Sequence, residues 1–281
     1  MKTTMLTFFF CLVLPSFAMG FQQLATIPLS MMNQSVDDMY DGCNEAMAKK
    51  AASVYFPREI KNQPFNEAWR VAKSFAKTKY NNRKDKELTL NQVQAIYVYT
   101  QEFPRFYENL NAAVRVGADS YMAAFPFHAF HFWLTSAIQI LSDNKQCQTT
   151  YRRNNVRFRG QVNQEIRFGY FASSSKEPSL TTFGKETCFH IETCFGASIE
   201  NYSGKSESEV LIPPYEKFKI IRIETGSYKS CCDPRRGRAK LPLRALENDP
   251  KFIPSPVCGA LWPANMQSLS TPDLRPAHRL R

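Results

Sequence analysis

The sequence lacks the ligand spacing of a zinc site. It has eight cysteines and four histidines, but no CxxC pair and no Cys/His cluster with ligand spacing. His128 and His131 lie one helical turn apart, yet the neighbouring aromatic residues favour packing in a core over metal binding. We therefore expect no bound metal.

Long apolar runs are also scarce. The run over residues 5–14 is too short to span a bilayer, and it lies between Lys2 and a small-residue cleavage site at Ala18-Met19-Gly20. Residues 271–281 are polar and basic, whereas a GPI signal needs a hydrophobic tail of about 10–20 residues. We expect residues 1–20 to be a signal peptide, with no transmembrane segment, and the protein to be secreted, unless another form of it carries an anchor.

Acidic residues are fewer than basic ones, 25 against 36, which gives a formal net charge of +11. The densest basic patch is formed by Arg235, Arg236, Arg238 and Lys240. Three interpretations stay open for it: a solvated loop, contact with an extracellular polyanion, and a processing site. No nucleic-acid-binding motif accompanies the patch, so we expect no nucleic-acid partner.

Seven cysteines remain once Cys11 is removed with the signal. In an exported protein they should form disulfides, and because seven is odd, one is free or pairs between chains. These cysteines are Cys43, Cys147, Cys188, Cys194, Cys231, Cys232 and Cys258.

The apolar pattern changes character halfway along the chain. Helical spacing occurs over residues 66–78, 90–103 and 120–142, whereas short β-rich segments follow at 156–159, 166–174, 187–195, 209–213 and 216–224. This order predicts an α+β protein. We expect a helical lobe over residues 21–143, a β-rich lobe over 144–232, and an irregular basic tail over 233–281.

Two carboxylates stand two residues apart before an apolar run, as Glu207 and Glu209 in Glu-Ser-Glu-Val-Leu-Ile-Pro. If this run is a strand, both side chains lie on one face, about 6–7 Å apart. That spacing suits the two carboxylates of a glycosidic displacement. Taken alone, the same pattern is also common on solvated strands.

Upstream residues add a phosphate-binding pattern. Arg159-Gly160 combines the side chain that binds phosphate through paired donors with a residue that lets a ligand approach the backbone. The run from Ser173 to Ser175 supplies hydroxyls that can orient a carboxylate. With these elements in this order, residues 37–228 resemble the arginine-specific ecto-mono-ADP-ribosyltransferases of vertebrates, whose signature is Arg, a Ser-x-Ser strand, then Glu-x-Glu.

The resemblance implies the ADP-ribosyltransferase fold, in which a helical N-terminal lobe precedes a mixed β-sheet sandwich that carries the NAD cleft. It also implies a glycosyltransferase that moves ADP-ribose from NAD to arginine side chains of acceptor proteins and releases nicotinamide. NAD is then the co-substrate, with NADP use left open. Two alternatives remain: an NAD glycohydrolase that uses the same site, and a non-catalytic secreted protein that binds polyanions.

Residue roles follow from the same resemblance. Glu209 would hold the ribose and counter its positive charge, Glu207 would orient the acceptor guanidinium, and Ser173 would orient Glu209. Arg159 would bind the NAD phosphates and complete the catalytic set. The residues expected at the NAD site are Arg159, Gly160, Ser173, Phe183, Tyr99 and Ser203.

The resemblance also implies two disulfides, one between Cys147 and Cys194 and one from Cys43 to Cys231 or Cys232. Asn33 and Asn201 head N-glycosylation acceptors, and the second lies just before the glutamate pair. We treat a glycan at Asn201 as a hypothesis, with an unused acceptor as its alternative.

Overall fold

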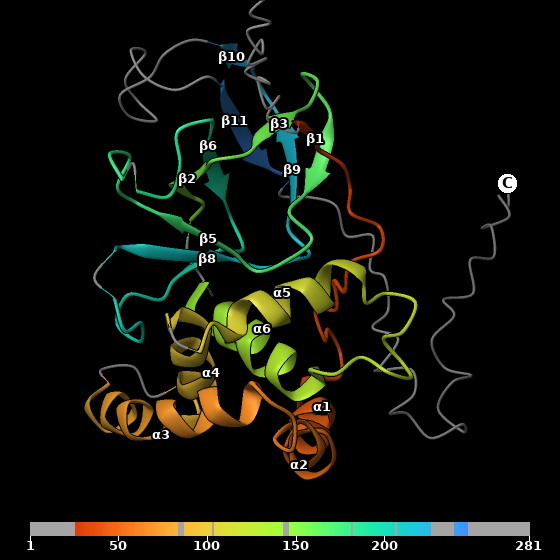
Figure 1. Ribbon diagram of the computed structural model, residues 1–281, viewed down its shortest axis with the longest axis vertical. Helices are drawn as coiled ribbons and strands as arrows, with labels where there is room; N and C mark the ends of the chain where they lie inside the picture. The colour runs from red at the N-terminus through yellow and green to blue at the C-terminus, as the bar shows by residue number, and fades with distance from the viewer. Residues whose placement is uncertain are drawn as a thin grey trace, which may run out of the picture.

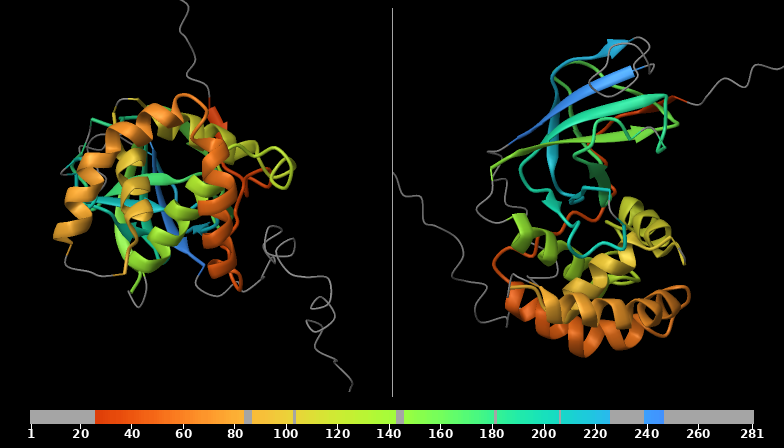
Figure 2. Two further views of the ribbon diagram at one scale, coloured as in Figure 1. Left: turned by 90° about the horizontal axis from the view of Figure 1, so that it is seen from below. Right: turned by 90° about the vertical axis from the view of Figure 1, so that its left-hand side faces the viewer.

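The computed structural model describes residues 26–83, 87–102, 104–142, 146–180, 182–205, 207–225 and 239–246. Helices form one layer and strands form the other (Figure 1, Figure 2). The predicted α+β class and the order of the two lobes are therefore confirmed. The signal peptide, the arginines of the basic patch and the C-terminal residues lie outside the described part of the chain.

Within the described residues, the helical lobe is built from seven segments. A capping box of Thr89 and Gln92 begins α4 at the predicted residue 90, and the Glu59 carboxylate accepts hydrogen bonds from the Ala129 and Phe130 amides at the start of α6. The third predicted helix begins at His128 instead of residue 120, because the chain forms turns before it. The segments are α1 (Asn44–Lys50), the π-helix η1 (Ala51–Tyr55), α2 (Phe56–Glu59), α3 (Phe65–Asn82), α4 (Leu90–Thr100), α5 (Phe106–Val116) and α6 (His128–Ser142).

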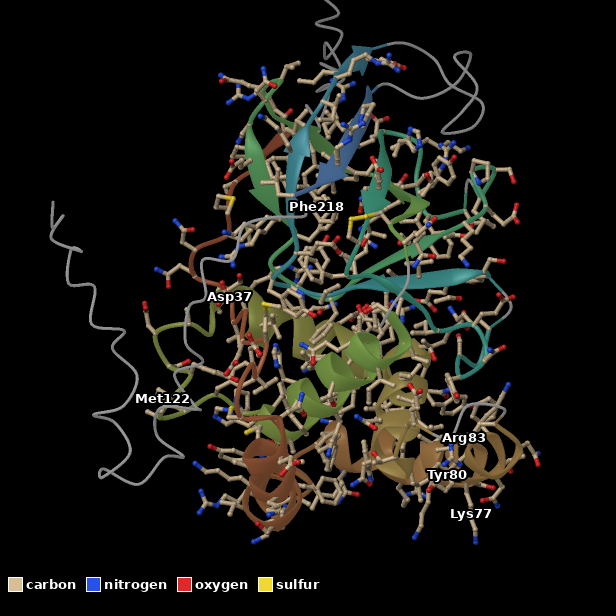
Figure 3. All side chains as sticks on the ribbon, turned by 180° about the vertical axis from the view of Figure 1, so that it is seen from behind. Asp37, Lys77, Tyr80, Arg83, Met122 and Phe218 are labelled. Carbon is tan, nitrogen blue, oxygen red and sulfur yellow. A yellow bond between two sulfur atoms is a disulfide. The ribbon has the colours of Figure 1, made fainter. Side chains whose placement is uncertain are left out.

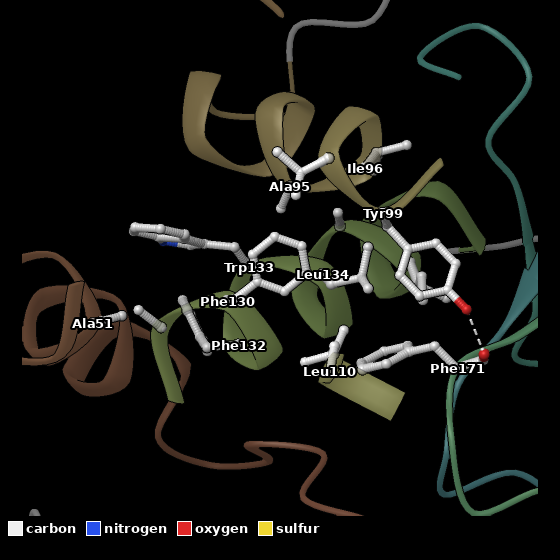
Figure 4. Packing of buried hydrophobic residues seen from close by; sticks show 14 of the residues in the cluster. Ala51, Ala95, Ile96, Tyr99, Leu110, Phe130, Phe132, Trp133, Leu134 and Phe171 are labelled. Carbon is white, nitrogen blue, oxygen red and sulfur yellow. Dashed lines mark hydrogen bonds between the residues drawn. The ribbon is translucent and has the colours of Figure 1, made fainter. Parts of the chain in front are cut away.

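Aromatic packing holds this lobe together around α6. Trp69 of α3 stacks on Trp133 of α6 with ring centroids 5.2 Å apart, and Phe65 contacts Phe130 edge to face at 5.6 Å. Each such side chain contributes about 1.5–3 kcal/mol by leaving water. Figure 4 shows that the cluster continues through Tyr99 to Phe171 of the β lobe, so the core joins both lobes.

The β lobe is a mixed sheet with strand order β4-β9-β11-β6-β2-β5-β8-β7. A second core, with Phe218 near its centre in Figure 3, packs against it. The strands are β1 (Thr26–Pro28), β2 (Gln148–Asn154), β3 (Arg157–Arg159), β4 (Glu165–Arg167), β5 (Ala172–Ser175), β6 (Thr187–Thr193), β7 (Ala197–Ser198), β8 (Glu209–Ile212), β9 (Lys217–Ile220), β10 (Glu224–Thr225) and β11 (Ala239–Ala245).

Two segments differ from the predicted lobe boundaries. The tail is not irregular throughout, because β11 lies between β9 and β6 in the main sheet, with Leu241, Leu243 and Ala245 buried. Pro242 between them obscured this alternation in the sequence. Residues 26–28, which were predicted to belong to the helical lobe, lie in the β lobe instead, because they form β1 and pair with β3.

Covalent and ionic links join parts of the chain that are distant in sequence. Cys147 before β2 forms a disulfide with Cys194 after β6, which confirms that pairing. Cys43 is disulfide-bonded as well, but Cys231 and Cys232 lie outside the described residues. Arg167 of β4 forms an ion pair with Asp37, which lies at the junction of the lobes in Figure 3. The segment before α1 is thereby fixed to both lobes.

Candidate active site

A cavity of about 390 Å³ opens where the helical lobe meets the sheet, within the size range of small-molecule sites. Its walls come from α4 and α5 on one side and from β2, β5 and the segment before β8 on the other. The side chains that bear on its chemistry are Tyr99, Arg115, Arg152, Tyr170, Ser173, Phe183, Lys205, Glu207 and Glu209.

The helices position β5 through polar contacts with Phe171. Tyr99 of α4 donates its hydroxyl to the Phe171 carbonyl at 2.5 Å, a contact drawn in Figure 4. Asn111 of α5 donates to the same carbonyl at 3.2 Å and accepts from the Phe171 amide at 3.1 Å. Burial raises the pKa of Tyr99, so its hydroxyl keeps its proton. The predicted Tyr99 thus lies in the cavity wall and anchors the strand that carries Ser173.

The three consecutive serines of β5 have separate tasks. Ser174 donates its hydroxyl to the Val210 carbonyl at 2.8 Å, and Ser175 donates to the Glu207 carbonyl at 2.7 Å. These bonds hold β5 against β8 and the segment before it. The Ser173 hydroxyl instead acts on the Glu209 carboxylate and lowers its pKa. The predicted residues Ser173 and Glu209 are therefore neighbours in the cavity wall.

Glu209 is only 7% exposed, although it lines the cavity. Burial raises its pKa, and the nearby Glu207 carboxylate raises it further. Hydrogen bonds from the Ser173 and Ser203 hydroxyls, together with the Lys205 charge, act in the opposite direction, but the net pKa lies above 4.5. Ser203 thus acts on the site by lowering the pKa of Glu209. The carboxylate is partly desolvated and fixed, as stabilisation of positive charge requires.

Glu207 lines the same cavity, but strand alternation does not place it there. The strand β8 begins at Glu209, and Ser208 before it has a left-handed φ of 47°. Lys205 acts electrostatically on both glutamates and forms an ion pair with Glu102 at 2.9 Å. The two carboxylates therefore share the cavity because the chain turns at Ser208.

An arginine reaches Ser173, but it is Arg152 of β2 and not Arg159. Arg152 donates through Nη1 to the Ser173 carbonyl and through Nη2 to the Tyr170 hydroxyl at 3.3 Å. Its Nε is shielded from solvent and has no hydrogen-bond partner in the described chain. Arg152 thus combines cavity exposure, contact with the serine strand and an unused donor.

Arg159 and Gly160 lie elsewhere, which corrects their predicted place. They line a separate depression with Pro28, Leu29 and Gln164, where β3 pairs with β1 outside the main sheet. A Cβ on Gly160 would come within 2.4 Å of the Ile220 side chain, so this glycine permits packing against β9. The physical reason is the break between β2 and β3, which turns the later arginine away from β5. The break between β2 and β3 could not be predicted from the arginine-rich sequence of this segment.

Phe183 lines the cavity with 48% of its side chain exposed. The next residue, Gly184, has a φ of 149°, and a Cβ there would come within 2.1 Å of the Asn154 backbone. Only glycine lets this loop lie so close to β2. An exposed aromatic ring is therefore held at the cavity edge.

The two histidines of α6 belong to the core. His131 Nδ1 hydrogen-bonds the Tyr40 hydroxyl at 2.7 Å, and His128 stacks on Tyr55 with ring centroids 4.4 Å apart. Burial lowers the pKa of His128 to about 4 and that of His131 to about 3, so both are neutral at pH 7. Within the described ranges, no three His, Cys, Asp or Glu side chains cluster as metal ligands.

None of the helices in the described ranges is both long enough and apolar enough to cross a membrane. The longest, α3, is amphipathic and carries several lysines. Its buried residues face the aromatic core, which accounts for its apolar side.

Comparisons with known proteins agree with this architecture. The family model for NAD:arginine ADP-ribosyltransferase matches residues 29–232. Ecto-ADP-ribosyltransferase 5 of Rattus norvegicus is 35% identical over 214 residues, which cover 71% of this chain and 69% of the relative. The erythroblast NAD(P)(+)--arginine ADP-ribosyltransferase of Gallus gallus is 34% identical over 203 residues, covering 69% and 67%.

A solved structure gives the same result in three dimensions. A mutant of the eukaryotic mono-ADP-ribosyltransferase ART2.2 in complex with NAD superimposes with a TM-score of 0.67 at 27% identity, covering 80% of this chain and 97% of that one. The predicted fold is thereby confirmed, as is the resemblance noted in the sequence. The chain belongs to the NAD:arginine ADP-ribosyltransferase family.

Proposed function

We propose that the cavity binds NAD and transfers its ADP-ribose to an arginine side chain, with Glu209 as the catalytic carboxylate. One observation carries this proposal. Glu209 is buried at the cavity wall, and its carboxylate lies next to Ser173, whose hydroxyl lowers the pKa of Glu209 and whose carbonyl binds Arg152. A phosphate-binding side chain and a positioned carboxylate thus meet through a single serine.

The residues present fit a dinucleotide. Arg152 has an unused Nε donor and a guanidinium that suits a phosphate, and Phe183 offers an exposed ring for the nicotinamide. Tyr99 closes the wall beside Ser173. The ART2.2 relative was solved in complex with NAD. In this proposal Arg152 takes the phosphate role predicted for Arg159, and Gly160 has no role in the site.

The chemistry follows from the positions of the two glutamates. The bond between the ribose carbon and the nicotinamide nitrogen breaks, and its electron pair leaves with nicotinamide. Glu209 stabilises the positive charge that develops on the ribose, as carboxylates do in glycoside hydrolysis. Glu207 binds the incoming guanidinium and accepts the proton that its nitrogen loses on forming the new bond.

The proposed location is outside the cell. The Cys147–Cys194 disulfide suits an oxidising compartment, and several relatives are named as ecto or GPI-linked enzymes. Secretion as a soluble protein stays a prediction from the N-terminal sequence, as does glycosylation of the exposed Asn33 and Asn201. Contact of the basic patch with a polyanion also stays a prediction.

Product analysis tests the proposed reaction. We expect the protein, incubated with labelled NAD and agmatine, to form ADP-ribosyl-agmatine, and Glu209→Gln to abolish both this product and free ADP-ribose. Glu207→Gln should reduce transfer more than NAD hydrolysis, because water needs no guanidinium site. Free ADP-ribose as the sole product would instead assign an NAD glycohydrolase, and full activity of Glu209→Gln would remove Glu209 from its role.

A further inference from the structure

A second arginine, Arg115, faces the same cavity from the helical lobe. It lies in the last turn of α5, and its guanidinium carbon is 4.0 Å from the centroid of the Tyr170 ring. The guanidinium of Arg152 lies 5.6 Å from the same centroid, approaching from β2. Two arginines from different lobes therefore meet at one tyrosine of the cavity wall.

Arg152 also donates a hydrogen bond to the Tyr170 hydroxyl at 3.3 Å, and the charges of both arginines act on this hydroxyl. Burial raises the pKa of Tyr170, but the two guanidiniums outweigh burial and lower the net pKa. Each guanidinium has five N–H donors in a planar fork, and Tyr170, together with the Ser173 carbonyl in the case of Arg152, uses only a part of them. The remaining donors are available to a ligand in the cavity.

The charges of Arg115 and Arg152 are not balanced by a carboxylate. In the described parts of the chain neither arginine forms an ion pair, and Glu108, which lines the same cavity, pairs with Arg105 at 3.3 Å. The glutamates at the other wall are coupled to Lys205 instead. Two uncompensated cations around one ring repel each other, and a bound anion would relieve that repulsion.

We propose that Arg115 and Arg152 form a clamp for a diphosphate, with Tyr170 as the spacer that holds the two guanidiniums apart. The inference rests on the proposed function, since the diphosphate is that of NAD, and it adds Arg115 of the helical lobe as a binding residue. A paired arginine matches two linked phosphates because each fork can bind one of them through parallel N–H donors.

The test measures ADP binding by calorimetry, which needs no turnover. We expect Arg115→Met to weaken ADP binding about tenfold or more, as loss of a charge-assisted contact should. Arg70→Met is the matched control, because Arg70 is exposed on α3 and outside the cavity, and it should bind ADP as the wild type does. Arg115→Lys keeps the charge without the fork and should fall between the two.

A kinetic measurement separates binding from a structural role. Arg115→Met should raise KM for NAD while KM for agmatine stays within about twofold, because a charge lost at the diphosphate leaves the acceptor site unchanged. Unaltered ADP affinity in Arg115→Met, or an equal rise of both KM values, would overturn the clamp. If the wild type transfers no ADP-ribose, the proposed reaction fails, and the calorimetric comparison still decides the clamp.

Discussion

Ser173 connects the parts of the proposed site. Its carbonyl accepts a hydrogen bond from Arg152, and its hydroxyl lowers the pKa of the neighbouring Glu209 carboxylate. Ser174 and Ser175 direct their hydroxyls to backbone carbonyls instead. The Ser-Ser-Ser run and the pairing of the two glutamates could be predicted from the sequence, although Glu207 reaches the cavity through the left-handed turn at Ser208 and not through strand alternation. The arginine could not be predicted, because four arginines lie between residues 152 and 159, and the end of β2, which separates the first two from the last two, is not marked in the sequence.

Removing the Ser173 hydroxyl should move the pH dependence of the reaction. Its hydrogen bond lowers the pKa of Glu209, so Ser173→Ala should raise that pKa. Because the ionised carboxylate is the active form, the acid limb of kcat/KM should shift to higher pH. Ser174→Ala is the control, since its hydroxyl binds the Val210 carbonyl, and its acid limb should stay in place. If the acid limb of kcat/KM stays at the same pH in Ser173→Ala, the ionisation of Glu209 does not produce that limb.

The turn after β6 is held by a buried glutamate. Glu216 accepts from the Thr193 hydroxyl at 2.6 Å and from the amides of Cys194 and Phe195 at 2.7 and 3.1 Å. This carboxylate therefore fixes the half of the turn that carries the disulfide to Cys147. This role could not be predicted from the sequence, because a glutamate directly before Lys217 is typical of an exposed position.

Stability should depend on the protonation of Glu216. Burial raises the pKa of Glu216 from 4.5 to about 7. The protonated side chain therefore contributes fully to the free energy of unfolding below about pH 4.5, and this contribution is lost as the pH rises through 7. Glu216→Gln lacks this titration. Its deficit in unfolding free energy relative to the wild type should shrink by about 2–3 kcal/mol between pH 5 and pH 8.

Urea unfolding at the two pH values measures this change. Glu192→Gln is the control, because Glu192 lies in β6, the strand before the turn that Glu216 holds, with its side chain half exposed and paired with Arg244. A deficit of Glu216→Gln that is equal at pH 5 and pH 8 would show that the carboxylate is ionised throughout this range.

The two lobes act as one body because their contacts converge on the cavity. The aromatic core runs from Trp133 to Phe171, and Tyr99 and Asn111 bond the backbone of Phe171 beside β5. The α+β order could be predicted from the change of apolar period. The place of β11 could not, because its pairing with β6 and β9 spans distant parts of the chain. Long-range pairing also decides which arginine faces the cavity.

Rates of ADP-ribose transfer to agmatine by Arg152→Ala and Arg159→Ala decide whether the interlobe cavity is the active site. Both variants remove an arginine from a strand of the β lobe, and melting temperatures show whether each is folded. We expect Arg152→Ala to lower kcat/KM by about 100-fold or more and Arg159→Ala to stay within about twofold of the wild type. A large loss in Arg159→Ala, with Arg152→Ala close to the wild type, would contradict the assignment of the cavity.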